Sequence, residues 1–142
     1  MRTNRLPLRV VLVAMAPLLA CTGGDAANPS SRTVDTVLVE LATAGLVVED
    51  AREADGAALG GGACKRGLVR GVEVTLCRYQ DPAAARAAEP AGLTVVGETT
   101  GTALARGPLL LVVADRAGKD REGKTIDAVT RAFLQRPART PS

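Results

Sequence analysis

Two cysteines placed evenly on either side of a short turn constrain the fold of this chain more than any other feature. Residues 63–69 and 72–79 can form two strands around Arg70-Gly71. If that dipeptide is the turn of a β-hairpin, Cys64 lies opposite Cys77 at a non-hydrogen-bonded position, where side chains approach most closely. A disulfide there would close a loop of about 14 residues and contribute about 3 kcal/mol. Two free buried thiols, or a bridge in another register, are the alternatives.

The remaining patterns predict one domain over residues 33–136. Helical spacing of apolar residues begins at Thr33 and stops near Gly45, whereas residues 50–62 have the composition of a loop. A second hairpin is expected at residues 102–106 and 109–115. The order α-β-β-α-β-β-α predicts an α+β fold, with a small antiparallel sheet of about four strands and helices packed on one face.

Two aspartates mark the starts of the later helices. Asp81 precedes a proline, which is the usual N-cap and first position of a helix, and that helix should end near residues 90–92. Residues 93–97 are expected to form a strand or an ordered loop. Asp120 is expected to cap a final helix whose buried face carries Ile126, Val129, Phe133 and Leu134.

The first 20 residues have the three parts of an export signal. Arg2, Arg5 and Arg9 precede an apolar run over residues 10–20 that ends next to Cys21. This run is much shorter than the roughly 20 residues that a membrane-spanning helix needs. We therefore expect residues 1–20 to be removed on export.

Leu18, Ala20 and Cys21 match the lipobox of bacterial lipoproteins, which this segment resembles, although Leu19 stands where a smaller residue is usual. The resemblance implies cleavage before Cys21, a diacylglyceryl group on its sulfur and a further acyl chain, such as palmitate, on the new amino terminus. Two or more chains hold a protein stably to a bilayer. An ordinary secreted protein cut after Ala20, or an uncleaved anchor, is the alternative.

Small and polar residues fill the segment from Cys21 to residue 32, which predicts a flexible tether holding the domain close to the membrane. Residues 137–142 are expected to form a disordered tail. In lipoproteins of cells with two membranes, an aspartate after the lipidated cysteine marks retention in the inner membrane. Thr22 stands there in this chain, so the resemblance implies the outer membrane, facing the periplasm, in a cell that has one.

Removing the signal changes the charge of the chain. The whole sequence has 18 basic and 15 acidic residues, and three of the arginines belong to the signal, so the mature part has 18 − 3 = 15 of each and a formal net charge of zero. Tyr79 and Phe133 are the only aromatic residues. Nucleic-acid binding needs a basic surface and usually stacking rings, so we do not expect a nucleic-acid partner.

Residues 118–125 match the phosphate-binding pattern G-x-x-x-x-G-K-[ST], and over these eight residues the chain resembles P-loop nucleotide hydrolases. That resemblance implies that Lys124 would contact the phosphates and Thr125 would hold magnesium. Asp120 and Glu122, however, place negative charge where phosphates would bind. Too little chain follows to build a parallel sheet, and an exported compartment normally lacks ATP. We therefore interpret the segment as an ordinary helix start.

The residue composition also excludes other common catalytic arrangements. The chain has no histidine, and the serines of its mature part are Ser30, Ser31 and Ser142, all in the predicted tails. Two thiols without histidine make a poor metal site, and they are not spaced as a redox motif. Asp115 ends an apolar strand, where a turn or capping role beside Arg116 is expected. We expect no catalytic residue, no cofactor and no metal.

Two classes of function remain. The favoured one is a non-catalytic, lipid-anchored envelope protein that binds a protein partner or contributes to an envelope assembly. The alternative is a small-ligand-binding protein or an enzyme that acts near the bilayer, with residues 60–64 and Asp115 as its best candidates. A cleft joining those two segments would favour the alternative. A flat polar surface with one apolar patch would favour partner binding.

Overall fold

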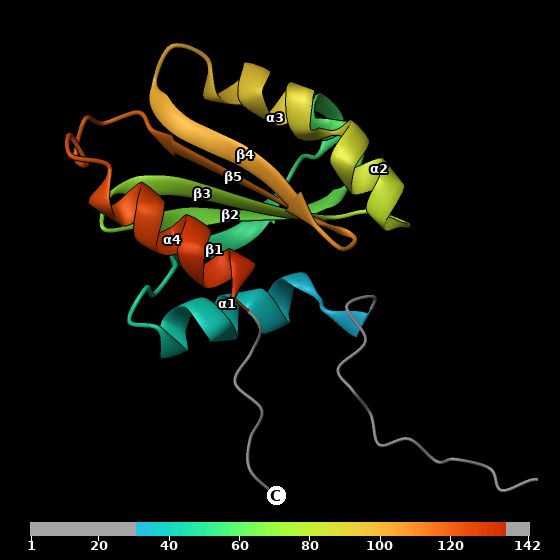
Figure 1. Cartoon of the computed structure of the whole chain (residues 1–142), viewed down its shortest axis with the longest axis horizontal. Coiled ribbons are helices and arrows are strands. Elements are labelled where there is room, and N and C mark those ends of the chain that lie inside the picture. The colour runs from blue at the N-terminus through green and yellow to red at the C-terminus, as the bar shows by residue number, and fades with distance from the viewer. Residues whose placement is uncertain (1–30, 136–142) are drawn as a thin grey trace, which may run out of the picture.

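In the computed structural model, which describes residues 31–135, five strands form one antiparallel sheet in the order β1-β2-β3-β5-β4 (Figure 1). The strands are β1 (Glu49–Ala54), β2 (Ala63–Val69), β3 (Val72–Arg78), β4 (Thr100–Arg106) and β5 (Leu109–Asp115). The predicted signal, Cys21, the tether up to residue 30 and everything from residue 136 lie outside the described residues. Within residues 31–135, no helix is long and apolar enough to cross a bilayer.

Four α-helices pack on the sheet, and the α+β class is confirmed. They are α1 (Val34–Thr43), α2 (Pro82–Ala87), α3 (Glu89–Val96) and α4 (Lys124–Leu134), with a short 3₁₀ helix, η2 (Ala57–Leu59). The Thr33 hydroxyl accepts from the Thr36 N–H at the start of α1. The Asp81 carboxylate accepts from the Ala84 N–H, so the predicted cap of α2 is confirmed.

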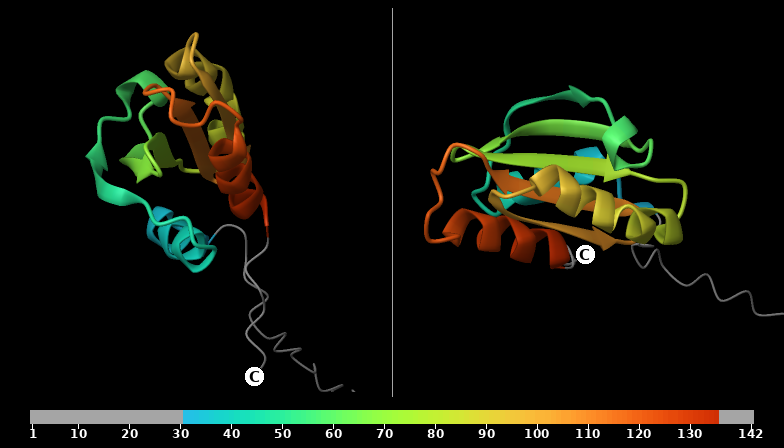
Figure 2. Two further views of the ribbon diagram at one scale, coloured as in Figure 1. Left: turned by 90° about the vertical axis from the view of Figure 1, so that its left-hand side faces the viewer. Right: turned by 90° about the horizontal axis from the view of Figure 1, so that it is seen from above.

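The sequence predicted helices on one face of the sheet, but the helices cover both faces (Figure 2). The reason lies in β5, which is apolar from Leu109 to Ala114 and buried at every position. Its odd-numbered residues face α1 and α4, and its even-numbered residues face α2 and α3. A central strand that is apolar on both sides needs a cover on both sides.

The first predicted hairpin is confirmed residue by residue. Val69 pairs with Val72, and Cys64 pairs with Cys77. The two sulfurs form a disulfide, and the Cα atoms are 4.0 Å apart. Arg70 and Gly71 both have positive φ, 50° and 82°, as a primed hairpin turn requires. Arginine is an unfavourable residue for that backbone region, so the turn is held by the strands on either side.

Strand β1 was not predicted, because its sequence Glu-Asp-Ala-Arg-Glu-Ala has no apolar alternation and almost every residue is exposed. It pairs with β2 through its backbone at the edge of the sheet, with a bulge between Glu49 and Arg52. Gly67 allows this pairing, because a Cβ there would lie 2.5 Å from the Glu49 carbonyl oxygen. The segment expected to be a loop is therefore partly an edge strand.

Helix α3 corrects the prediction for residues 93–97. The Pro-Ala-Gly sequence that resembled a helix stop lies inside the helix, with Pro90 in its first turn, where a missing N–H costs nothing. Gly92 faces the sheet, and a Cβ there would lie 2.7 Å from the Cβ of Ala103. The glycine thus brings α3 close to β4 and does not end the helix.

Two separate cores result. The core under α1 and α4 is built from large side chains: Val34, Val37, Leu41, Leu46, Val69, Val72, Val74, Leu76, Leu109, Leu111, Val113, Val129 and Phe133. The core under α2 and α3 contains more small ones: Leu59, Cys64, Cys77, Tyr79, Ala85, Ala88, Val96, Leu110, Val112 and Ala114. Leu134, predicted to be buried, is 49% exposed at the end of α4.

Candidate functional site

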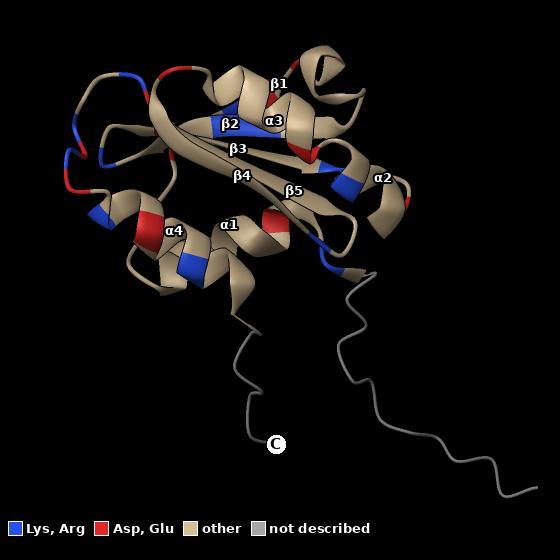
Figure 3. Cartoon of the chain, turned by 45° about the horizontal axis from the view of Figure 1, so that its top comes forward, with Lys and Arg blue, Asp and Glu red and all other residues tan. Residues whose placement is uncertain are grey.

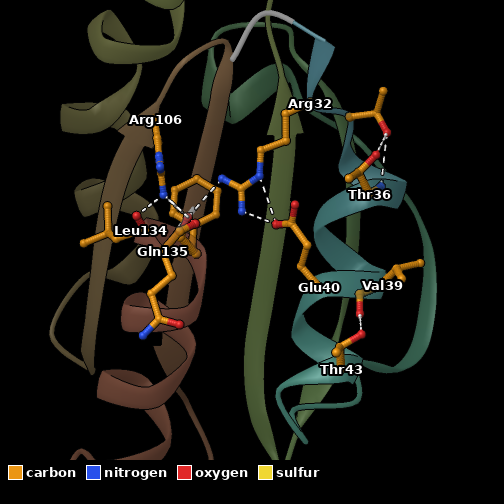
Figure 4. A network of polar contacts seen from close by, with 10 residues as sticks. Arg32, Thr36, Val39, Glu40, Thr43, Arg106, Leu134 and Gln135 are labelled. Atoms are coloured by element: carbon orange, nitrogen blue, oxygen red, sulfur yellow. Dashed lines mark hydrogen bonds and ion pairs between the residues drawn. The ribbon is translucent and has the colours of Figure 1, made fainter. Parts of the chain in front are cut away.

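The point where the described chain begins is held by a polar cluster around Arg32 (Figure 4). The Arg32 guanidinium donates to the Glu40 carboxylate from Nε at 3.0 Å and again from Nη2. It also donates to the Phe133 carbonyl at 2.9 Å and lies over the Phe133 ring, 5.0 Å from its centre. The Arg32 side chain is only 11% exposed. The predicted tether included Arg32, but its side chain belongs to the folded domain.

Two more arginines bind backbone carbonyls at the same place. Arg78 donates to the Arg32 carbonyl, and Arg106 donates to the carbonyls of Phe133, Leu134 and Gln135 at the end of α4. Residues 31 and 135 therefore lie close together. We call this end of the sheet the junction end; it is marked by Arg32, Arg78 and Arg106. The opposite end, which carries the β2–β3 turn and the β5–α4 loop, is called the loop end.

The disulfide lies near the junction end, on the face of α2 and α3. Cys64 is 2% exposed and Cys77 is fully buried. The Tyr79 hydroxyl donates to the Leu59 carbonyl of η2, and burial raises the pKa of this phenol. A Cβ on Gly62 would lie 2.9 Å from the Tyr79 ring, so the glycines before Cys64 let the loop pass over the ring. The 60–64 segment therefore forms a packed cover over the bridge.

Asp115 organises the loop between β5 and α4. The residue is 7% exposed, and its carboxylate accepts from the N–H groups of Lys119 and Asp120, both at 2.8 Å. The expected turn role is confirmed, although the partners are backbone groups of the loop. Arg116, the neighbour named in that prediction, donates instead to Glu73 and to the Val95 carbonyl.

The carboxylate of Asp120 caps α4 from outside the helix. It accepts from the Ile126 N–H at 2.8 Å, while Gly123 occupies the N-cap position itself. Asp120 therefore makes the predicted capping bond from three residues further back. Lys124, which would bind phosphates in a P-loop, pairs with Glu122. Within the motif, the N–H groups of Lys119 and Asp120 are bonded by the Asp115 carboxylate, and the Gly123 N–H is bonded by the Asp120 carbonyl.

The two candidates of the small-ligand alternative lie at opposite ends of the sheet. Cys64 pairs with Cys77 on β3, and Cys77 pairs with Leu110 on β5. Asp115 lies 115 − 110 = 5 residues further along that strand, which is about 17 Å at the usual rise per residue. The two segments therefore do not line one compact pocket, and the cavity that Cys64 lines does not include Asp115.

One shallow cavity lies at the junction end, between the start of α1 and the ends of β1–β3. It measures about 210 Å³, and Asp35, Glu53, Lys65 and Arg78 contribute to its lining. This is below the roughly 300–1,000 Å³ of typical ligand pockets. The Lys65 ammonium is 2.7 Å from Asp35 and 3.7 Å from Glu53, and the hydrogen bond to Asp35 raises its pKa. Lys65 thus pairs with both acids of this cavity, while Arg78 donates to the Arg32 carbonyl.

A strip of the sheet on the α2/α3 face has no helix over it. Helices α2 and α3 pack on β4 and β5, so β1 and β2 extend beyond them (Figure 2, right). Basic residues of β2 lie in the part of the strand beside α3 (Figure 3), and Arg66 is the one on the same face as Cys64. We call this surface the arginine strip and define it by Arg52, Arg66, Leu68, Glu73 and Arg116.

The charges of the arginine strip are unevenly paired. Arg52 and Arg66 are directly opposite each other on β1 and β2. Arg66 donates to the Thr75 hydroxyl and is 3.9 Å from Glu73, while Arg116 is 3.3 Å from the same carboxylate. Within residues 31–135, Arg52 has no acidic side chain at ion-pair distance.

The sequence analysis missed this surface because it depends on β1. Without an edge strand, Arg52 stood in a loop and Arg66 had no neighbour on that side. The signal that was available is the alternation of Cys64, Arg66 and Leu68, which places two non-core residues on the same face as a buried cysteine.

Comparison with known proteins gives no match to any family model, to any curated protein or to any solved structure. Over residues 31–135, no group of three His, Cys, Asp or Glu side chains is arranged to hold a metal ion.

Proposed function

We propose that this chain is a lipid-anchored protein of the bacterial envelope, and that its domain is a non-catalytic module that binds a protein partner. The lipid is carried by Cys21, after removal of residues 1–20. The tether of residues 22–31 then leads into Arg32 at the junction end. The proposal also includes the outer membrane, facing the periplasm, in a cell with two membranes, because Thr22 follows the anchor.

The single observation that carries the proposal is the attachment of Arg32. Its guanidinium pairs with Glu40 of α1 and binds the Phe133 carbonyl of α4, so the first residue after the tether is tied to two helices of the larger core. Breaking one partner of a largely buried ion pair is costly, since it leaves the other charge without compensation. Force applied through the tether would therefore act on helices α1 and α4 of the larger core, as an anchored module requires.

The non-catalytic part of the proposal is supported by the use of the buried acids. Asp115 and Asp120 are the buried aspartates of the described chain, and their carboxylates are bonded to backbone N–H groups of the β5–α4 loop and of the first turn of α4. These carboxylate oxygens are thus engaged with the chain's own backbone. These two acids stabilise the loop end.

The anchor is tested by metabolic labelling with an alkyne analogue of palmitate, followed by separation of membranes. Wild type should carry the label and sediment with membranes, whereas Cys21→Ala should carry none and leave the membrane fraction or remain unprocessed. Cys64→Ala/Cys77→Ala is the matched control and should keep the label per molecule. Equal labelling of wild type and Cys21→Ala would refute the anchor.

A further inference from the structure

We propose that the arginine strip is the docking surface for an acidic segment of a partner protein, which places carboxylates on Arg52 and Arg66 and an apolar side chain on Leu68. This inference rests on the proposed function, because it names the surface and the chemistry of the partner that the tethered module binds. Its first support is the placement of like charges.

Arg52 and Arg66 are cross-strand neighbours of the same sign. Like charges directly opposite each other on adjacent strands destabilise a sheet. Glu73 lies 3.9 Å from Arg66 and is shared with Arg116, which leaves the Arg52 end of the pair without compensation. An acidic ligand across the two guanidinium groups would remove this repulsion.

The geometry of the pair suits carboxylates. Guanidinium groups bind carboxylates through two parallel N–H bonds, which gives direction as well as strength. Arg66 is held in place by its bond to the Thr75 hydroxyl, and Thr75 itself is 2% exposed on the floor of the strip. Arg116 is fixed by Glu73 and by the Val95 carbonyl of α3. Two of the three arginines are thus already ordered before a ligand arrives.

Leu68 favours a polypeptide over a simple anion. It is 39% exposed, and it lies on the same face as Arg66, between Glu49 of β1 and Glu73 of β3 in the sheet register. An extended segment with an acidic and an apolar residue two positions apart presents both on one face, so it could contact both Arg66 and Leu68, which are two positions apart on β2. A phosphate or a polyanion would leave Leu68 uncovered.

The position of the strip argues against a lipid surface. Arg32, which leads to the anchor, is at the junction end, whereas Arg66 is the middle residue of β2 and Arg116 follows β5 at the loop end. The strip therefore faces to the side of the tether axis and towards the loop end. A protein beside the module reaches it more readily than the bilayer below.

The test uses the mature chain without its lipid and two labelled peptides, acetyl-(Glu-Ser-Leu-Ser)₂-amide and its counterpart with Gln in place of Glu. Binding is measured by fluorescence anisotropy at low salt. The Glu peptide should bind at least about fivefold more tightly than the Gln peptide, and this preference should shrink as salt is added. Arg52→Gln/Arg66→Gln should abolish the preference. Arg86→Gln/Arg121→Gln removes the same charge from exposed positions elsewhere and should keep it.

A melting curve separates loss of the site from loss of the fold. Because the double substitution removes a like-charge pair, the strip variant should melt no lower than wild type while losing the peptide. Equal binding of the two peptides, or equal loss in strip and control variants, would overturn the inference. So would tighter, strip-dependent binding of polyphosphate or of phosphatidylglycerol vesicles. Loss of fatty-acid labelling at Cys21 is scored separately, so failure of the anchor and failure of the strip are distinguishable.

Discussion

The two faces of the sheet are built on different principles. The face under α1 and α4 is covered by two helices and filled with Leu, Val and Phe side chains, and it also receives the Arg32 cluster. The face under α2 and α3 has an alanine-rich core over β4 and β5, a disulfide at the junction end and an open strip over β1 and β2. The first face supplies most of the apolar burial, and the second keeps a polar surface available because a covalent bond supports its thinner core.

The largest expected effect tests the first face. Phe133 is fully buried between α4 and the sheet, so Phe133→Ala should lower the free energy of unfolding by about 3–5 kcal/mol. Val39→Ala, at a position 66% exposed on the outer side of α1, should change it by less than about 0.5 kcal/mol. Urea denaturation of both variants measures the difference. A cost below about 1 kcal/mol for Phe133→Ala would mean that this face is not the main core.

The next effect tests whether the disulfide supports the second face. Cys64→Ala/Cys77→Ala should cost about 2–4 kcal/mol, since the bridge restricts the unfolded chain. The comparison uses oxidised wild type and the variant without reductant, in guanidinium denaturation. An unchanged midpoint would show that the alanine-rich core is sufficient by itself.

A smaller effect tests the close contact of α3 with the sheet. Gly92→Ala should cost about 1–3 kcal/mol, because its Cβ would lie 2.7 Å from Ala103 and 3.1 Å from Val112. Thr94→Ala, at an exposed position of the same helix, is the control and should be nearly neutral. If Gly92→Ala were stabilising, as an alanine is in an open helix, the close packing of this face would be wrong.

The smallest effect is a pH dependence of the second face. Burial raises the pKa of Tyr79, so between about pH 10 and that raised pKa the folded protein keeps a proton that the unfolded chain has lost. The resulting stabilisation is complete below about pH 10 and is lost as pH rises through the raised pKa. Tyr79→Phe should therefore show a shallower alkaline loss of stability by urea denaturation. Lys65 has a raised pKa in both proteins and contributes equally to both curves. Parallel curves would contradict the burial of this phenol.

The parts of the fold that the sequence predicted are those set by local signals. The Cys64–Cys77 register followed from symmetry about a two-residue turn, and the start of α2 followed from Asp81-Pro82. The missed parts depend on tertiary contacts. Strand β1 is recognisable only by its pairing with β2, and Gly92 acts as a contact point only once α3 lies on β4.

The same division holds for the candidate sites. Asp115 and Asp120 could be predicted as turn and cap residues because their partners are at most six residues away. The Arg32–Glu40–Phe133 cluster and the arginine strip join residues far apart in the chain. No local pattern of charge predicts the cluster or the strip, because each depends on tertiary contacts between distant parts of the chain.

The most direct test of the account is photo-crosslinking in intact envelopes, with a benzoylphenylalanine residue at Leu68 on the open strip or at Val39 on the outer side of α1. The account predicts a discrete protein adduct from position 68, its loss on adding Arg52→Gln/Arg66→Gln, and no adduct from position 39. Equal adducts from both positions, or none from position 68, would contradict the claim that this anchored domain binds its partner through the uncovered part of its sheet.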